Sequence, residues 1–222
     1  MSRSLVFAIL PVFLGVSQVR AESKSHVRRS FDAPEVVHEL NMARQHPDTY
    51  AGHLEELRGH FQGNIFILPG RTMMHTREGA GAVDEAIRFL RRARPLGPLI
   101  LSAGLSKAAA AHVAEQASGA LGHTGSNHSS PANRISRYGT WSGRWGENIS
   151  YGKSSAREIV LALIVDDGLR DRHHRQIIFN PAFNYAGAAL GPHARYRTAC
   201  SIDFAGGYVE AGAGSSSLYA RN

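Results

Sequence analysis

Apolar residues recur at helical spacing through much of the first two-thirds of the chain, and short apolar runs rich in small residues dominate its last quarter. Residues three or four apart share one face of a helix, whereas alternate residues share one face of a strand. The pattern therefore predicts helices first and strands late, which is an α+β fold with helices packed on a small, mostly antiparallel sheet.

Helix starts are predicted from capping residues and prolines. The predicted helices begin at Pro34 with Asp32 as the cap, after Asp48, at Ala82, at Ser102 and at Ser130-Pro131. The helix from Ala82 runs to Arg94, and the helix from Ser102 is ended by Gly119 and Gly122. The last helix begins at the capping box Ser155 to Glu158, and its apolar body Ile159 to Val165 stops at Asp166-Asp167-Gly168.

Extended segments are predicted where apolar residues are bounded by turn formers. They cover 147–151, 184–190 and 195–204, with a turn at 191–193, while Trp141 to Trp145 is predicted as a glycine-containing connection. Residues 59–80 are the least readable part, with a short extended segment at 63–70 and a loop from Arg71 to Ala80. We interpret them as an insertion over one face.

The N-terminus has the pattern of a signal peptide. A short basic region is followed by an apolar run from Leu5 to Val16 and by Val19-Arg20-Ala21, a cleavage pattern. The run is shorter than the ~20 residues that span a bilayer. We expect residues 1–21 to be removed, a domain over residues 34–206, a flexible tail over residues 207–222, and a secreted or periplasmic protein without a transmembrane segment.

Charge and cysteine content exclude some functions. Removing residues 1–21 lowers the formal net charge from +7 to +5, and no basic run is interleaved with aromatic residues. Nucleic-acid binding is therefore not expected. The single cysteine, Cys200, cannot form an internal disulfide. It lies in a predicted strand, so we interpret it as a buried core residue and not as a nucleophile.

Several motifs of known enzymes are absent. Gly152-Lys153-Ser154 resembles the end of a phosphate-binding loop, but the glycine that this loop needs at position 147 is a glutamate. The chain has no G-x-S-x-G and no H-E-x-x-H pattern. The sequence therefore supports neither a nucleotide-binding loop nor a common serine hydrolase.

Imidazoles and carboxylates gather between Gly122 and Arg175, separated by glycine and serine turns. They are His123, Glu147, Asp166-Asp167 and His173-His174. Such side chains bind divalent metals and transfer protons near neutral pH. Structural roles are the alternative: Glu147 holding backbone amides, Asp166-Asp167 ending a helix and holding Arg170 or Arg172, His123 interacting with a helix C-terminus, and His174-Arg175 forming a surface basic pair.

The order of these pieces resembles the CAP superfamily of cysteine-rich secretory proteins, antigen 5 and pathogenesis-related class 1 proteins, and most closely the bacterial SCP-domain proteins. The resemblance covers roughly residues 34–206. It is carried by Asn41-x-x-Arg44-x-x-Pro47, Gly122-His123-x-Gly125, Arg134-Ile135-x-x-Tyr138-Gly139, Gly146-Glu147-Asn148-Ile149, His174-Arg175 and Cys200 to Phe204.

This resemblance implies an α-β-α sandwich with a cleft lined by His123, Glu147, Asp166 and His174, with Asp167 as a rival for the second acid. It also implies a divalent metal, usually zinc, bound by His123 and His174, and a lipid or sterol as ligand. The chain departs from the family pattern at His173 and Leu163, where glycine and tryptophan are usual, in using aspartate as the second acid, and in lacking the secretory disulfides.

Three functions follow. The first is an exported protein whose cleft binds a divalent metal and a small or lipidic ligand without turnover, and we favour it because no nucleophile motif is present. The second is a metal-assisted peptidase or esterase that uses a histidine-bound water. The third is a module that contacts a protein partner in the cell envelope through residues 59–80, with a purely structural cleft. Whether the protein is an enzyme stays open at this point.

Overall fold

A mixed sheet lies at the centre of the computed structural model, which describes residues 32–70 and 73–212. Within those residues the sheet has four strands in the order β4 (Ile100–Leu101), β6 (Tyr185–His193), β7 (Arg197–Glu210) and β5 (Gly139–Tyr151). β4 runs parallel to β6, and the other neighbours are antiparallel. The prediction of a small, mostly antiparallel sheet is confirmed.

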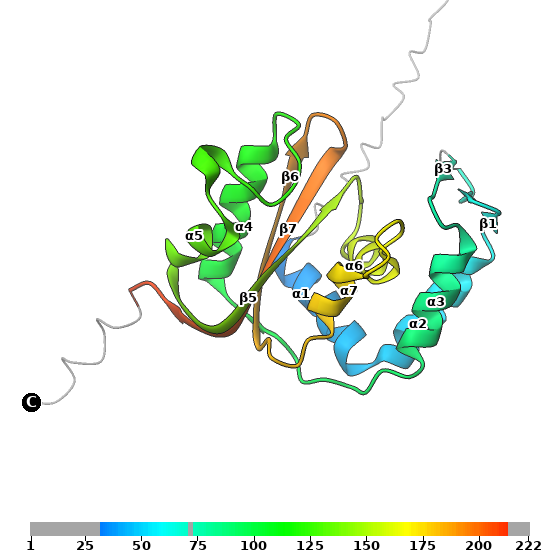
Figure 1. Ribbon diagram of the computed structural model, residues 1–222, viewed down its shortest axis with the longest axis horizontal. Helices are drawn as coiled ribbons and strands as arrows, with labels where there is room; N and C mark the ends of the chain where they lie inside the picture. Colours follow the sequence, from blue (N-terminus) through cyan, green and yellow to red (C-terminus); the bar gives the residue numbers. More distant parts are fainter. Residues whose placement is uncertain (1–31, 71–72, 213–222) are drawn as a thin grey trace, which may run out of the picture. The chain divides into compact units, whose positions relative to one another are not determined.

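Helices cover both faces of this sheet, which makes the α-β-α sandwich (Figure 1). One face carries α4 (Ala103–Gln116) and α5 (Pro131–Ser136), and the other carries α1 (Ala33–Gln45), α6 (Ala156–Val165) and α7 (His173–Ile178). Beyond that second layer lie α2 (Pro47–Arg58) and α3 (Ala80–Leu90), which pack on each other. A short 3₁₀ helix, η1 (Ser126–His128), precedes α5.

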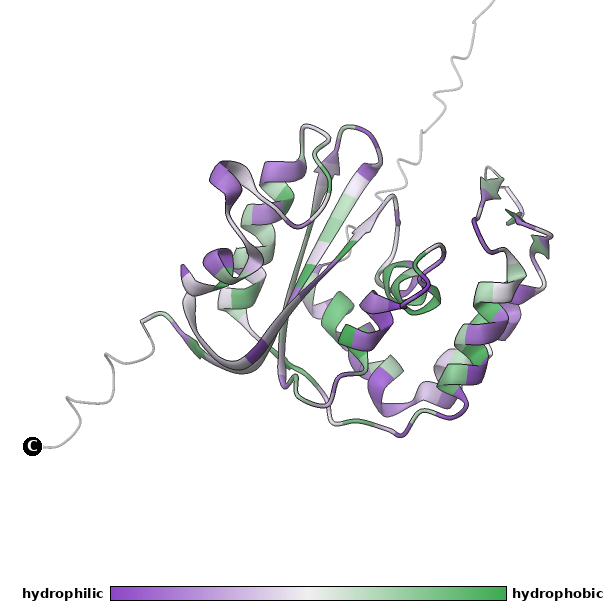
Figure 2. Ribbon diagram, viewed as in Figure 1, coloured by the Kyte–Doolittle hydropathy of each residue, from purple (hydrophilic) through white to green (hydrophobic). Residues whose placement is uncertain are grey.

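Apolar clusters fill both sides of the sheet. The larger cluster joins α1, α2, α3 and α6 to the sheet, and a smaller one joins Leu105, Ala108 and Ile135 to Ala205 and Tyr208. The body of α6 is apolar along most of its length (Figure 2), and six residues of α6 have less than 8% of their surface exposed: Ala156, Ile159, Val160, Leu161, Leu163 and Ile164. The prediction of a helix buried on most sides is therefore confirmed.

The predicted insertion contains a small sheet of its own. β1 (Phe61–Gln62), β2 (Ile65–Phe66) and β3 (Met74–His75) pair antiparallel in that order. The prediction of a loop from Arg71 to Ala80 was therefore wrong at β3, and the first turn of α3 begins at Ala80. β3 is only two residues long, and such a strand has no periodic pattern that a sequence can show.

Most predicted helix starts are confirmed, because their caps are local contacts. Asp32 accepts the backbone N–H of Glu35 at 3.1 Å, Ser102 accepts that of Leu105 at 3.1 Å, and Ser155 accepts that of Glu158 at 3.2 Å. Asp48 was wrongly predicted as a cap, since α2 begins behind His46 with no side-chain cap. The capping box at Ser155 also differs from the predicted one, because the Glu158 carboxylate accepts the backbone N–H of Ser154, the residue before the N-cap.

Several element ends differ from the prediction, and pairing with a distant residue decides the end of β7. The segment 141–145 lies inside β5, β6 continues through the predicted turn to His193, and the helix predicted to reach Arg94 ends at Leu90. β7 continues to Glu210 opposite Gly139, so residues 207–210 belong to the sheet and not to a tail. The predicted signal peptide and residues 213–222 lie outside the described residues. Within the described part of the chain, no helix is both long and apolar enough to cross a membrane.

Arg44 on α1 ties three segments of the outer layer together. Its guanidinium is buried and donates to the carbonyl oxygens of Gly97 at 3.1 Å, Ile178 at 2.7 Å, Asn180 at 3.1 Å and Phe183 at 3.2 Å. These carbonyls come from the loop before β4, from the last residue of α7 and from the loop between α7 and β6, so this single side chain holds the segments that lead into both strands.

Replacing Arg44 by methionine is expected to lower the free energy of unfolding by about 3 kcal/mol or more, because several partly buried carbonyl groups lose their donor. Urea denaturation followed by circular dichroism measures the change. Arg91→Met is the control, because Arg91 makes only exposed ion pairs with Glu55 and Asp48. An Arg44→Met protein as stable as the Arg91→Met protein would contradict this role.

Candidate functional site

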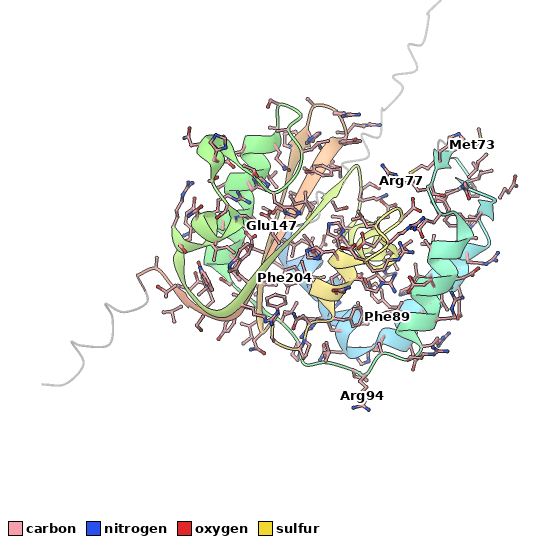
Figure 3. All side chains as sticks on the ribbon, viewed as in Figure 1. Met73, Arg77, Phe89, Arg94, Glu147 and Phe204 are labelled. Carbon is pink, nitrogen blue, oxygen red and sulfur yellow. The ribbon has the colours of Figure 1, made fainter. Side chains whose placement is uncertain are left out.

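Glu147 lies in the middle of β5 and is almost completely buried, with 4% of its surface exposed (Figure 3). Its Oε1 lies 2.8 Å from Nδ1 of His123, and its Oε2 accepts hydrogen bonds from Nη2 of Arg134 at 2.7 Å and from Oγ of Ser201 at 3.2 Å. Burial raises the pKa of Glu147, but the hydrogen bonds from His123 and Arg134 outweigh it and hold the pKa below its usual value. Glu147 is therefore an ionised acceptor.

The backbone that carries His123 is held by the same arginine. Arg134 is fully buried on α5 and donates to the carbonyl oxygens of His123 and Ser129, each at 3.0 Å. Gly122 precedes the histidine with φ +90°, a conformation that glycine adopts without strain. The imidazole is 46% exposed. In the neutral imidazole, a proton on Nδ1 would be donated to Glu147 and the lone pair would then be on Nε2.

A second histidine–acid pair forms at the C-terminal end of α6. Asp166 adopts the left-handed conformation with φ 54° and ends this helix. Its Oδ1 lies 2.7 Å from Nδ1 of His174, and its Oδ2 accepts the backbone N–H of the same residue at 2.9 Å. The neighbouring Asp167 instead accepts the backbone N–H groups of Arg77 and Glu78. Of the two rival acids, Asp166 is thus the one that contacts His174.

The two pairs are attached to opposite faces of β5, because successive residues of a strand point in opposite directions. Glu147 contacts Arg134 on α5, whereas the Nδ2 of Asn148 donates to the carbonyl oxygen of His174 on α7 at 3.1 Å. β5 is an edge strand of the described sheet, so groups on its two faces can approach the same edge. The structure therefore gathers the predicted residues around β5 as two pairs, and not as one hydrogen-bonded cluster.

A cleft of about 670 Å³ runs along this edge. His123 and Glu147 line it, while Asp166 and His174 do not, and His173 takes part in the lining from α7. Within residues 32–70 and 73–212, no group of three or more His, Cys, Asp or Glu side chains is arranged to hold a metal ion. A metal at this site would therefore have two imidazole ligands at most, each oriented by a carboxylate on its Nδ1.

The buried groups behind the cleft were not predicted. His112 on α4 lies with its Nε2 4.0 Å from Oε1 of Glu147, and Asp203 on β7 is the register partner of Glu147. Neither has any exposed surface. Both lie on the apolar face of an element that the sequence pattern identifies correctly, so a polar residue at a core position was the signal that could have found them.

Asp203 is a buried acid beside another acid. Its two carboxyl oxygens have no hydrogen-bond donor among the described residues. Burial and the negative charge of Glu147 outweigh the nearby charge of Arg134 and raise the pKa of Asp203 well above its usual value. The folded protein therefore favours the neutral acid. The thiol of Cys200 is also buried, and burial raises its pKa, which confirms the predicted core role.

The Asp203→Asn variant tests this protonation state. The folded chain keeps the Asp203 proton over a pH range in which the unfolded chain, with a pKa of about 3.9, releases it. The wild type should then lose up to about 1.4 kcal/mol of unfolding free energy per pH unit above pH ~4, relative to the variant. Denaturation of both proteins between pH 4.5 and 7.5 measures the difference, in which all shared titrations cancel. Parallel stability curves would show that Asp203 is ionised in the folded state.

Comparisons with known proteins identify the family. The family model for the cysteine-rich secretory protein family, CAP, matches residues 85–204. Among curated proteins, none matches the chain. An extracellular SCP-domain protein of Bacillus anthracis is 16% identical with a TM-score of 0.41, over 54% of this chain and 37% of that one. An outer surface protein of Borrelia burgdorferi is 18% identical with a TM-score of 0.40, over 50% of this chain and 78% of that one.

The chain thus spans little more than a third of the length of the Bacillus protein. The family model covers 120 of the 222 residues, more than half of the chain, and includes His123, Glu147, Asp166 and His174. The protein therefore belongs to the cysteine-rich secretory protein (CAP) family.

Proposed function

We propose that this protein is exported and that its cleft binds a divalent metal ion, zinc in the first instance, together with a small ligand, without turnover. The proposed metal ligands, through Nε2, are His123 in the lining of the cleft and His174, which lies outside that lining. The lipid or sterol class stays a prediction from the family resemblance. Export rests on the signal-peptide pattern of residues 1–21.

The observation that carries the metal proposal is the carboxylate that each of the two imidazoles contacts through Nδ1. Each has its Nδ1 within 2.8 Å of a carboxylate oxygen, from Glu147 or from Asp166. Histidines that bind metals commonly donate their second ring nitrogen to a carboxylate, which fixes the tautomer and raises the basicity of the ligating nitrogen. Imidazole is a common zinc ligand, but two imidazoles are fewer than the three protein ligands of catalytic zinc sites, so water or ligand would have to fill the remaining positions. A bound ion would polarise such a ligand.

The hydrolase alternative has less support. A general base must have a free oxygen within reach of the water that it deprotonates. Both oxygens of Glu147 already accept hydrogen bonds, and its side chain has 1% of its surface exposed. The paired acid on the other face, Asp166, also has both oxygens engaged by His174. The contacts of both carboxylates support an orienting role toward the imidazoles more than a role as a base.

The test is a calorimetric titration of zinc into residues 22–222. We expect one zinc ion per chain, bound more weakly than in structural sites with four protein ligands, because only two side chains hold it. His123→Ala and His174→Ala should each abolish the binding, whereas His38→Ala, on the exposed face of α1, should not. If the wild type is folded and binds no zinc, the metal proposal is wrong.

The acid that supports His174 can be identified in the same assay. Asp166→Asn should weaken zinc binding by roughly 10- to 100-fold, because the imidazole loses the carboxylate that orients it. Asp167→Asn is the matched control, since Asp167 accepts only backbone N–H groups of the Arg77-Glu78 segment. Equal effects of the two substitutions would show that Asp166 acts only through the fold of the loop.

A further inference from the structure

We propose that the wall of the cleft formed by β5 and α7 binds an oligosaccharide that carries carboxylate groups. This inference rests on the proposed function, since it names the ligand class of the same cleft. It concerns the walls of the cleft and does not involve the two proposed metal ligands.

The first observation is the location of the tryptophans. The chain has two, Trp141 and Trp145, and both line the cleft from β5. Trp145 is 38% exposed. The indole Nε1 of Trp141 donates to Oγ of Ser136 at 3.1 Å, so its ring is oriented and its polar atom is satisfied before any ligand arrives. Flat aromatic surfaces held in this way suit the apolar C–H face of a sugar ring.

The second observation is a pair of side-chain amides on the wall opposite β5, each with one of its two polar atoms hydrogen-bonded. Gln176 donates its Nε2 to the carbonyl oxygen of Asp171 at 2.6 Å, and Asn180 accepts the backbone N–H of Ala182 at 2.9 Å. Oε1 of Gln176 and Nδ2 of Asn180 have no partner among the described residues. The lining of the cleft thus offers one acceptor and one donor, and a sugar hydroxyl can form a hydrogen bond with either of them.

The third observation is charge. Arg144 lines the cleft and has no hydrogen-bond or ion-pair partner for its guanidinium within residues 32–70 and 73–212. The carboxylate of Glu147 is already paired with the buried Arg134 at 2.7 Å. The unpaired charge of the cleft wall is therefore cationic, and a planar guanidinium recognises carboxylates through two parallel hydrogen bonds.

Other ligand classes fit less well. A lipid chain would bury Arg144, Gln176 and Asn180 without partners, which is costly. An extended peptide would have to pair with the free edge of β5, but the register with β7 shifts between Ser142 and Trp145. Gly143 at this bulge has φ +75°. A bulge interrupts the regular row of backbone groups that strand addition requires.

Because both tryptophans line the cleft, intrinsic fluorescence reports its occupation directly. The probes are tetragalacturonate and a hyaluronan tetrasaccharide, with maltotetraose, tetraglutamate and decanoate for comparison. We expect a saturable fluorescence change with at least one acidic saccharide, in buffer with EDTA, and weaker or absent binding of the other three probes. Binding of neither acidic saccharide, or tighter binding of any comparison probe, would overturn the inference.

Substitutions locate the binding. Arg144→Gln and Trp145→Phe should each weaken the affinity for the acidic saccharide by about tenfold or more. Arg137→Gln, an exposed arginine outside the cleft lining, should leave it unchanged. If Arg144→Gln and Arg137→Gln behave alike, the binding is a general charge effect and the proposed wall is wrong.

The zinc titration separates this inference from the proposed function. Arg144→Gln and Trp145→Phe should keep full zinc binding, and His123→Ala should keep saccharide binding measured in EDTA. Zinc binding without saccharide binding would overturn only the ligand class. Saccharide binding without zinc binding would overturn only the metal proposal.

Discussion

The buried ion pair between Arg134 and Glu147 is the interaction on which the site depends. Two opposite charges are taken out of water here, and this is tolerated only when each is fully paired and hydrogen-bonded. The two terminal nitrogens of the arginine meet this condition by also holding the carbonyl oxygens of His123 and Ser129, whereas its buried Nε has no acceptor among the described residues. The loop that carries His123 is thereby fixed to β5, and the imidazole lies against the other carboxylate oxygen, Oε1. Loss of either charge would leave the other buried and unpaired.

The second histidine depends on the outer layer of the fold. Asp167 accepts the backbone N–H groups of Arg77 and Glu78, and the Glu78 carboxylate accepts the backbone N–H of Gly168 at 2.7 Å. Glu78 also pairs with Arg172, which donates to the carbonyl oxygen of Asp166 at 2.9 Å. These hydrogen bonds and the ion pair with Arg172 lower the pKa of Glu78 to about 2. The segment before α3 therefore supports the loop that presents Asp166 to His174.

The sequence predicts the parts of this structure that local contacts decide. Side-chain caps such as Asp32 and Ser102 act within three residues, so the starts of α1 and α4 were predictable. The end of β7 was not, because Glu210 pairs with Gly139, a partner far earlier in the chain. In the site, motif resemblance singled out the histidines and Glu147. Asp203 and the support of Asp166 by Arg172 were missed, because burial and pairing between distant segments leave no periodic signal.

The most direct test of the account is the state of the imidazoles in solution. Two-dimensional ¹⁵N NMR of the histidine rings distinguishes the proton on Nδ1 from the proton on Nε2. The account predicts that the neutral rings of His123 and His174 carry their proton on Nδ1, and that zinc shifts their Nε2 resonances before those of any other histidine. Rings protonated on Nε2, or resonances that do not respond to zinc, would contradict it.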